Sequence, residues 1–343
     1  MPPRFRKYSQ EHRDLYSQYN DNELRDLLFE NWSRPYEYES FTEFKERPFK
    51  GKYVNISEYG FRAVKNQGPW PPDKKNFNIF LFGGSTSFGY GVADSETTAS
   101  YLEDFISKDK KIYVYNFGRG SYCSSQELIL YENLIKSGNV PNMALFIDGL
   151  NDFGVGYQGH QLASAFRQYM EADSPGIIFQ LTHVLAELPV GGLVTRLQTK
   201  FSHAKDERTD LEKQYNDLPL LDFVIHRYLE NKKMIEAVSA YYGVKPIFVW
   251  QPVPTYHYNL KHYPFKIEYL ETHYYTKYGY PRMARIVKQH RLGSNFLWCA
   301  DIQSDAEKLL YVDLVHYSSD MSKTLAKQIA NFLIQRKMLD VGR

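Results

Sequence analysis

Short apolar runs alternate with amphipathic stretches along the chain from about residue 74 onward. The apolar runs predict buried strands at 77–83, 111–118, 143–149, 245–252 and 295–301. Apolar residues at helical spacing predict helices at about 97–108, 124–137, 222–243 and 320–338. Strands that alternate with helices form right-handed crossover units around a mainly parallel sheet, with helices on both faces. The pattern therefore predicts a three-layer α/β/α domain.

The first part of the chain, residues 1–72, lacks this alternation and predicts a helix followed by an extended arm. Apolar residues in 9–32 recur at helical spacing, and Ser33-Arg34-Pro35 ends the pattern because a helix rarely continues into a proline. The aromatic stretch 36–62 is predicted to be mostly extended. We expect residues 1–72 to pack on a main domain that spans 73–343.

Two long stretches interrupt the main domain, at about 153–220 and 253–292. Connections of this length are usually functional or independently folded. We expect both to cover the carboxyl edge of the sheet. The second stretch is dense in Tyr and His over 256–280, which is typical of a surface that stacks on sugars or of a lid that packs on its own domain.

Composition excludes several classes of protein. The chain has 343 residues, of which 43% are hydrophobic and 24% charged, as in ordinary soluble proteins. A net charge of +2 gives no support for nucleic-acid binding. No apolar run approaches the roughly 18–20 residues of a membrane span, and no signal peptide is visible. We expect a soluble protein, cytoplasmic by default, or one of the cell envelope or secreted if a signal has been trimmed; the oligomeric state stays open.

No metal or other cofactor is expected from the sequence. Cys123 and Cys299 lie far apart, and no Cys/His spacing resembles a zinc site. Two such cysteines are most simply interpreted as buried reduced thiols.

Four polar blocks follow predicted strands. They are Gly84-Ser85, Asn116 to Tyr122, Gly149 to Asp152, and Tyr311 to His316. Each block alone resembles an ordinary turn. Open α/β sheets bind ligands at the carboxyl edge of their strands, where all four blocks could meet. Their combination therefore predicts a functional site at this edge.

A nucleophile, a base and an orienting carboxylate can be assigned within these blocks. The hydroxyl of Ser85 is a poor nucleophile until a base takes its proton. His316 can be that base, since imidazole titrates near neutral pH. Asp313, three residues earlier, can hold the imidazole in one tautomer. We therefore expect a catalytic triad of Ser85, His316 and Asp313.

Attack on an ester carbonyl creates an oxyanion, which needs hydrogen-bond donors fixed in advance. The backbone N–H of Ser85, a backbone N–H from the turn at Gly120-Ser121 and the side-chain amide of Asn151 are available. We expect these three groups, with Ser121 supplying the second, to form the oxyanion hole.

Simpler interpretations remain for most of these residues. Ser85 and Asn151 could serve only in tight turns, and Asp313 could cap a helix beside a surface histidine. Arg119 is expected either to bind an anionic part of the substrate or to be a solvated loop arginine. Gln251 is expected to line the pocket.

The four blocks resemble those of the SGNH (GDSL-like) hydrolase superfamily over about 77–343, apart from the two insertions. The resemblance implies a five-stranded flavodoxin-like sheet, the triad above and Asn151 in the oxyanion hole. The first block has Gly-Gly-Ser where Gly-Asp-Ser is commoner. The glycine of the second block falls on Ser121, which bears on the size of the substrate. Relatives with this style of first block resemble envelope or polysaccharide-associated esterases.

These observations lead to one main hypothesis and two alternatives. The main hypothesis is a serine esterase that hydrolyses a carboxylic ester through an acyl-enzyme, with a short acyl group on a carbohydrate or similar small polar carrier. The near alternative is an O-acyltransferase that uses the same triad. A non-catalytic carbohydrate-binding protein with the same fold is the second alternative.

Overall fold

The computed structural model describes residues 13–107, 111–156, 212–289 and 292–339. Most of the predicted insertion at 153–220 lies outside these residues. The centre of the structure is a five-stranded sheet in the order β6-β5-β7-β8-β9, with every neighbouring pair parallel. Its strands are β5 (Phe77–Gly83), β6 (Ile112–Asn116), β7 (Met143–Asp148), β8 (Lys245–Trp250) and β9 (Phe296–Trp298). The predicted parallel sheet is confirmed.

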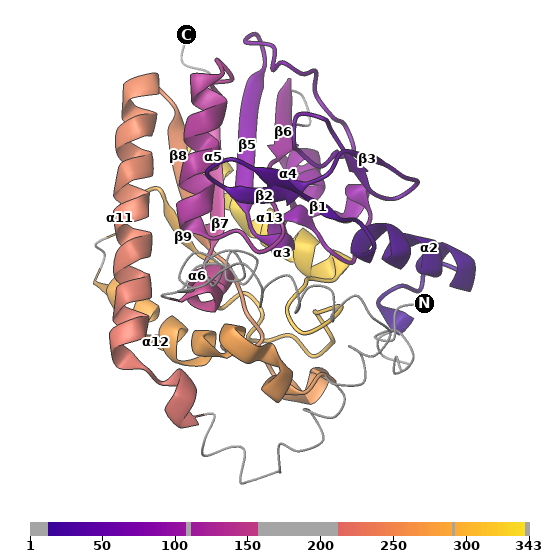
Figure 1. The fold of residues 1–343 in the computed structure, drawn as a ribbon, viewed down its shortest axis with the longest axis vertical. Helices are drawn as coiled ribbons and strands as arrows, with labels where there is room; N and C mark the ends of the chain where they lie inside the picture. Colours follow the sequence, from indigo (N-terminus) through magenta and orange to yellow (C-terminus); the bar gives the residue numbers. More distant parts are fainter. Residues whose placement is uncertain (1–12, 108–110, 157–211, 290–291, 340–343) are drawn as a thin grey trace, which may run out of the picture.

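Helices cover both faces of the sheet, which makes three layers (Figure 1). Ile79 and Leu81 of β5 pack with residues of α4 (Thr98–Ile106) and α13 (Ser319–Gln335). Phe80 and Phe82 point to the other face and pack with residues of α5 (Ser124–Lys136) and α11 (Leu218–Tyr242). Every residue of β5 is buried, as expected for a strand covered on both sides. The predicted three-layer α/β/α class is therefore confirmed.

The long helix α11 begins earlier than the predicted boundary at residue 222. The side chain of Asp217 accepts a hydrogen bond from the backbone N–H of Leu220, and Pro219 lies in the first turn. A proline is favoured there because its missing N–H would have no partner within the helix. Gly243 ends the helix in a left-handed conformation.

The helix predicted at 9–32 is divided, because residues 15–18 form a turn and a new helix starts at Asp21; residues 9–12 lie outside the described residues. In α2 (Asp21–Trp32), the side chain of Asn20 accepts from the backbone N–H groups of Asn22 and Glu23, and Glu23 accepts from the backbone of Asn20. This reciprocal cap fixes the start of the helix. The arm that follows forms two hairpin-like pairs, β1 (Tyr36–Glu39) with β2 (Glu43–Glu46), and β3 (Phe49–Lys50) with β4 (Asn55–Ile56).

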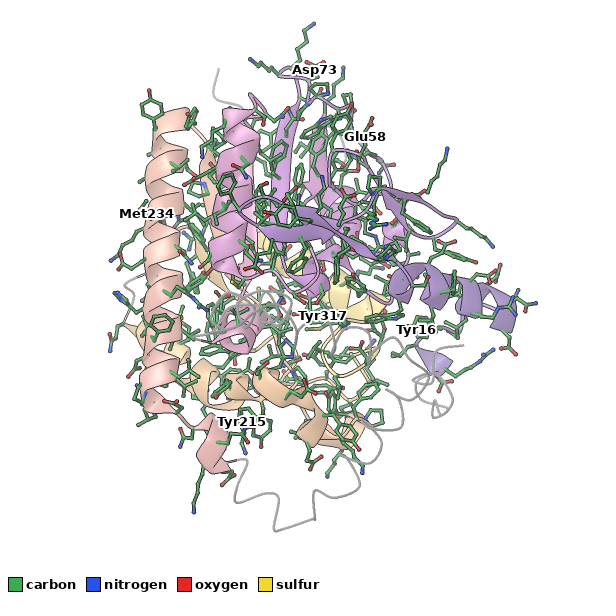
Figure 2. The ribbon with its side chains drawn as sticks, viewed as in Figure 1. Tyr16, Glu58, Asp73, Tyr215, Met234 and Tyr317 are labelled. Carbon is green, nitrogen blue, oxygen red and sulfur yellow. The ribbon has the colours of Figure 1, made fainter. Side chains whose placement is uncertain are left out.

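Shorter elements gather at the carboxyl edge of the sheet. They are α3 (Ser85–Phe88), η2 (Asp94–Glu96), α6 (Leu150–Val155), η3 (Leu260–His262), η4 (Ile267–Tyr275) and α12 (Thr276–Lys288). In Figure 1, α6 and α12 lie below the sheet. Figure 2 places Tyr317 toward this end and Asp73, which precedes β5, at the opposite end. Part of the 253–292 stretch therefore packs where the strands end.

Arg62 fastens the N-terminal arm to the loop that follows α3. Its side chain is fully buried and donates to the carboxylate of Asp94 at 2.8 Å. It also donates to the backbone carbonyls of Phe88, Gly89 and Val92. A buried guanidinium is tolerated only when its donors find such acceptors, so the arm and this loop are held as one unit.

We expect Arg62→Met to destabilise the fold by about 3–5 kcal/mol, because it removes the buried cation paired with Asp94 and four hydrogen bonds from its guanidinium. Chemical unfolding measures the loss. The control is Arg25→Met on the exposed surface of α2, which should shift the free energy of unfolding by less than about 0.5 kcal/mol. Equal stability of the two variants would contradict this role of Arg62.

Candidate active site

Ser85 follows β5 and is the first residue of α3. Gly84 separates the two, and a Cβ built on Gly84 would lie 2.1 Å from Nδ2 of Asn151 and 3.1 Å from the carbonyl oxygen of Tyr122. Only glycine therefore permits the approach of the Asn151 amide to this turn. Ser85 itself is partly exposed.

The structure brings Ser85, His316 and Asp313 together. Nε2 of His316 lies 2.8 Å from Oγ of Ser85. On the other side of the ring, Nδ1 lies 2.8 Å from Oδ2 and 2.9 Å from Oδ1 of Asp313. The three side chains lie in the hydrogen-bonding order that serine activation would require.

Asp313 is kept ionised by its surroundings. Burial alone would raise its pKa, but the neighbouring His316 and the backbone N–H groups of Val315 and His316 outweigh burial and lower the pKa to about 2. Both N–H groups lie 2.9 Å from Oδ1. The carboxylate is therefore charged at neutral pH and can accept a hydrogen bond from Nδ1–H of His316.

Two aromatic rings flank His316. The centroid of the Trp32 ring lies 5.2 Å from that of His316 in an edge-on arrangement, and the Tyr90 centroid lies at 5.5 Å. Trp32 also packs on Tyr90 at 4.9 Å. Trp32 ends α2, so the N-terminal region forms part of the wall of the site. The contact of Trp32 with His316 could not be predicted from the sequence, where Trp32 is one of several apolar residues at helical spacing.

Gln251 does not line a pocket as expected, because it is 2% exposed. Its side-chain oxygen accepts from the hydroxyl of Thr86 at 2.6 Å and from that of Tyr317 at 2.9 Å. Thr86 follows Ser85, and Tyr317 follows His316. Gln251 therefore ties together the two segments that carry the nucleophile and the base.

Arg119 was predicted to bind substrate or to be solvated, and its observed contacts differ from both. It is 3% exposed, and its guanidinium donates to Glu39 of β1 and to the hydroxyl of Tyr122. The neighbouring Gly120 donates its backbone N–H to Glu46 of β2 at 3.3 Å. These contacts hold the second block against the arm and leave Arg119 engaged in an internal ion pair.

Two of the expected oxyanion donors, Ser121 and Asn151, both adjoin Tyr122. Ser121 precedes Tyr122 in the sequence, and Asn151 forms a hydrogen bond with its carbonyl oxygen. Ser121 adopts a left-handed backbone with φ of 61°, a conformation that glycine adopts most easily. Nδ2 of Asn151 donates to the carbonyl of Tyr122 at 2.8 Å. Since Tyr122 follows Ser121 and the same amide packs on Gly84, the side chain of Asn151 connects the first and second blocks.

A second histidine, His273 of η4, was missed by sequence reasoning. Its Nε2 lies 3.3 Å from Oδ1 of Asn151. Burial, and then the neighbouring His316, lower the pKa of His273 to about 4. No spacing within the Tyr/His-rich stretch distinguishes His273 from its neighbours, so only the fold reveals its position.

Three carboxyl groups, those of Asp148, Asp152 and Glu127, lie close together near the start of α6, the helix that carries Asn151. Asp152 accepts from the hydroxyl of Ser124 at 2.6 Å and from the backbone N–H of Gly149 at 3.2 Å, which fixes the start of this helix. Burial, and then the charges of Asp148 and Asp152, keep the pKa of Glu127 well above its usual range. Within the described ranges, no group of three or more His, Cys, Asp or Glu side chains is arranged to hold a metal ion.

No protein-family profile matches the chain, and no curated protein matches it either. Solved structures do match it. They include a member of the lipolytic protein G-D-S-L family from Veillonella parvula, with 12% identity over 73% of this chain and 94% of that one, at a TM-score of 0.36. The psychrotrophic esterase EstA from Pseudoalteromonas sp. has 12% identity over 77% and 100%, at 0.39.

A variant of Axe2, an acetylxylan esterase from Geobacillus stearothermophilus, matches with 14% identity over 75% of this chain and 93% of that one, at a TM-score of 0.39. The function of this chain has to be inferred from the contacts of its own site.

We expect Glu127→Gln to stabilise the protein by about 1–3 kcal/mol at pH 8, because the amide can donate to Asp148 without a buried charge. The folded-state pKa of Glu127 lies above its ordinary value of 4.5. The wild type therefore loses stability as pH rises from about 4.5 through that raised pKa. Thermal unfolding at pH 5 and pH 8 should show the gap widening with pH. The control, Glu132→Gln on the same helix, should show no such trend.

Proposed function

We propose that this protein is a serine hydrolase that cleaves a carboxylic ester through an acyl-enzyme. The observation that carries the proposal is the continuous hydrogen-bonded order Ser85, His316, Asp313, with 2.8 Å between Oγ and Nε2 and 2.8 Å between Nδ1 and Oδ2. If Ser85 served only in a turn, its hydroxyl would not need a base beside it. The histidine would then not need a carboxylate on the other side of its ring.

The acylation step follows from this order. Oγ of Ser85 attacks the carbonyl carbon of the ester while Nε2 of His316 takes the hydroxyl proton. The imidazolium that forms is stabilised by the ionised Asp313. The tetrahedral intermediate then collapses, the C–O bond of the leaving alcohol breaks, and the alkoxide receives the proton from Nε2. The acyl group stays on Ser85 as an ester.

Deacylation repeats the same proton path with water. Water gives its proton to Nε2 of His316 and attacks the acyl carbon, and the proton returns to Oγ of Ser85 as the acid leaves. Ser85 is partly exposed, and the side chain of His316 is 12% exposed. Water can therefore reach the acyl-enzyme as the acceptor.

The oxyanion is assigned to three donors: the backbone N–H groups of Ser85 and Ser121 and Nδ2 of Asn151. The N–H of Ser85 is the first of α3, and the first N–H groups of a helix have no partner within it. One hydrogen of the Asn151 amide is used by Tyr122, which leaves the second for the oxyanion. Ser121 has a Cβ where the related blocks have glycine, so less room is expected there, which favours a short acyl group. We assign a small polar or carbohydrate carrier as the alcohol of the ester.

A fluorophosphonate probe should label Ser85 stoichiometrically in the folded protein, with the adduct located by peptide mass spectrometry. His316→Ala should abolish labelling because it removes the base. The same two proteins should differ in hydrolysis of p-nitrophenyl acetate. A folded wild type that neither takes up the probe nor hydrolyses the ester would refute the proposed function.

Asn151→Ala should lower kcat on the same ester by about 100- to 1,000-fold with little change in KM, because the amide acts on the oxyanion rather than on the ground state. Asn22→Ala, on the exposed surface of α2, is the matched control and should leave kcat unchanged. A drop in kcat below about 3-fold for Asn151→Ala would remove Asn151 from the oxyanion hole.

A further inference from the structure

The ring of His273 packs against α6, the helix that carries Asn151. Its Nε2 lies 3.3 Å from Oδ1 of Asn151. A Cβ built on Gly154 would lie 3.0 Å from Cδ2 and 3.1 Å from Nε2 of the same ring. Gly154 belongs to α6, so this helix leaves room for the histidine only because it carries no side chain there. The approach of His273 to Asn151 depends on this glycine.

The side-chain amide of Asn151 can have two orientations, and only one serves the oxyanion. In the observed orientation Nδ2 faces the carbonyl oxygen of Tyr122 and the turn at Gly84. After a flip, Oδ1 would face that carbonyl oxygen, and no side-chain N–H would remain beside the nucleophile's turn. The observed orientation leaves Oδ1 pointing at His273, where it requires a hydrogen-bond donor.

We propose that His273 is a positioning residue that donates a hydrogen bond from Nε2–H to Oδ1 of Asn151. This hydrogen bond holds the amide in the orientation that stabilises the oxyanion. The inference rests on the proposed function and deepens it, since it gives a segment distant in sequence a role in the same step. His273 acts through Asn151 and does not contact the reacting atoms.

A neutral donor suits this position. Burial and the nearby His316 keep the pKa of His273 near 4, so the ring carries no charge at neutral pH. During acylation His316 becomes positively charged, and a second cation beside it would oppose that step. The neutral ring has one N–H, so donation to Asn151 requires the Nε2–H tautomer, although the ring also faces the backbone carbonyl of Leu270. In that tautomer a neutral imidazole can hold the amide without this repulsion, whereas a lysine or arginine could not.

The experiment compares His273→Ala with His273→Gln, using p-nitrophenyl acetate as the probe substrate. A glutamine amide can donate from about the position of Nε2, whereas alanine cannot. We expect His273→Ala to lower kcat by about 10- to 100-fold with KM nearly unchanged. His273→Gln should stay within about 3-fold of the wild type. His262→Ala, a substitution in the same long stretch, is the control and should leave kcat unchanged.

A double-mutant cycle with Asn151→Ala separates positioning from a general structural role. If His273 acts through Asn151, then His273→Ala should cost almost nothing in the Asn151→Ala background. Gly154→Ala provides a second perturbation, because its methyl group would push the ring away while His273 itself is kept. It should lower kcat in the wild type and have little effect in the Asn151→Ala background.

The side-chain amide resonances of Asn151 give a readout that does not need activity. In the wild type, hydrogen exchange at Nδ2 should be slow, His273→Ala should accelerate it, and His273→Gln should not. An active wild type with equal losses in the Ala and Gln variants, or with a full His273→Ala penalty in the Asn151→Ala background, would overturn the inference. An inactive wild type would refute the proposed function instead, and the exchange rates would still decide whether His273 holds Asn151.

Discussion

All five strands of the central sheet run in the same direction, and the site depends on this constraint. Parallel strands deliver their carboxyl ends to one edge, so residues far apart in sequence can meet there. Ser85 follows β5, Asn151 follows β7, and Gln251 follows β8. His316 reaches the same edge 231 residues after Ser85. Gln251 then joins the segments of the nucleophile and the base through Thr86 and Tyr317.

The strands and the four polar blocks could be predicted because each is a local property of the chain. A run such as 77–83 is apolar throughout, and the glycines before Ser85 mark a sharp turn regardless of what packs on it. Asp313 and His316 are three residues apart, so their contact is also local. Such features need no knowledge of the rest of the fold.

The parts that could not be predicted depend on contacts between distant segments. Trp32 completes an ordinary apolar helix face, and only the packing of α2 brings its ring to His316. His273 is one of several histidines in an aromatic stretch. The sequence allowed a solvated loop arginine at Arg119, but the side chain is buried and forms an ion pair with Glu39. In each case the partner lies more than 75 residues away, beyond the reach of any local pattern.

The N-terminal arm has a consequence for how the protein is made. In the N-terminal region, Trp32 contacts His316, and Glu39 and Glu46 contact the second block. His316 itself lies near the last helix of the described chain, α13. During translation the segment of Ser85 leaves the ribosome more than 200 residues before that of His316. A growing chain therefore carries Ser85 without His316 until more than 200 further residues have been made. The pair of Ser85 and His316 can form only when these two distant segments have met at the same edge of the sheet.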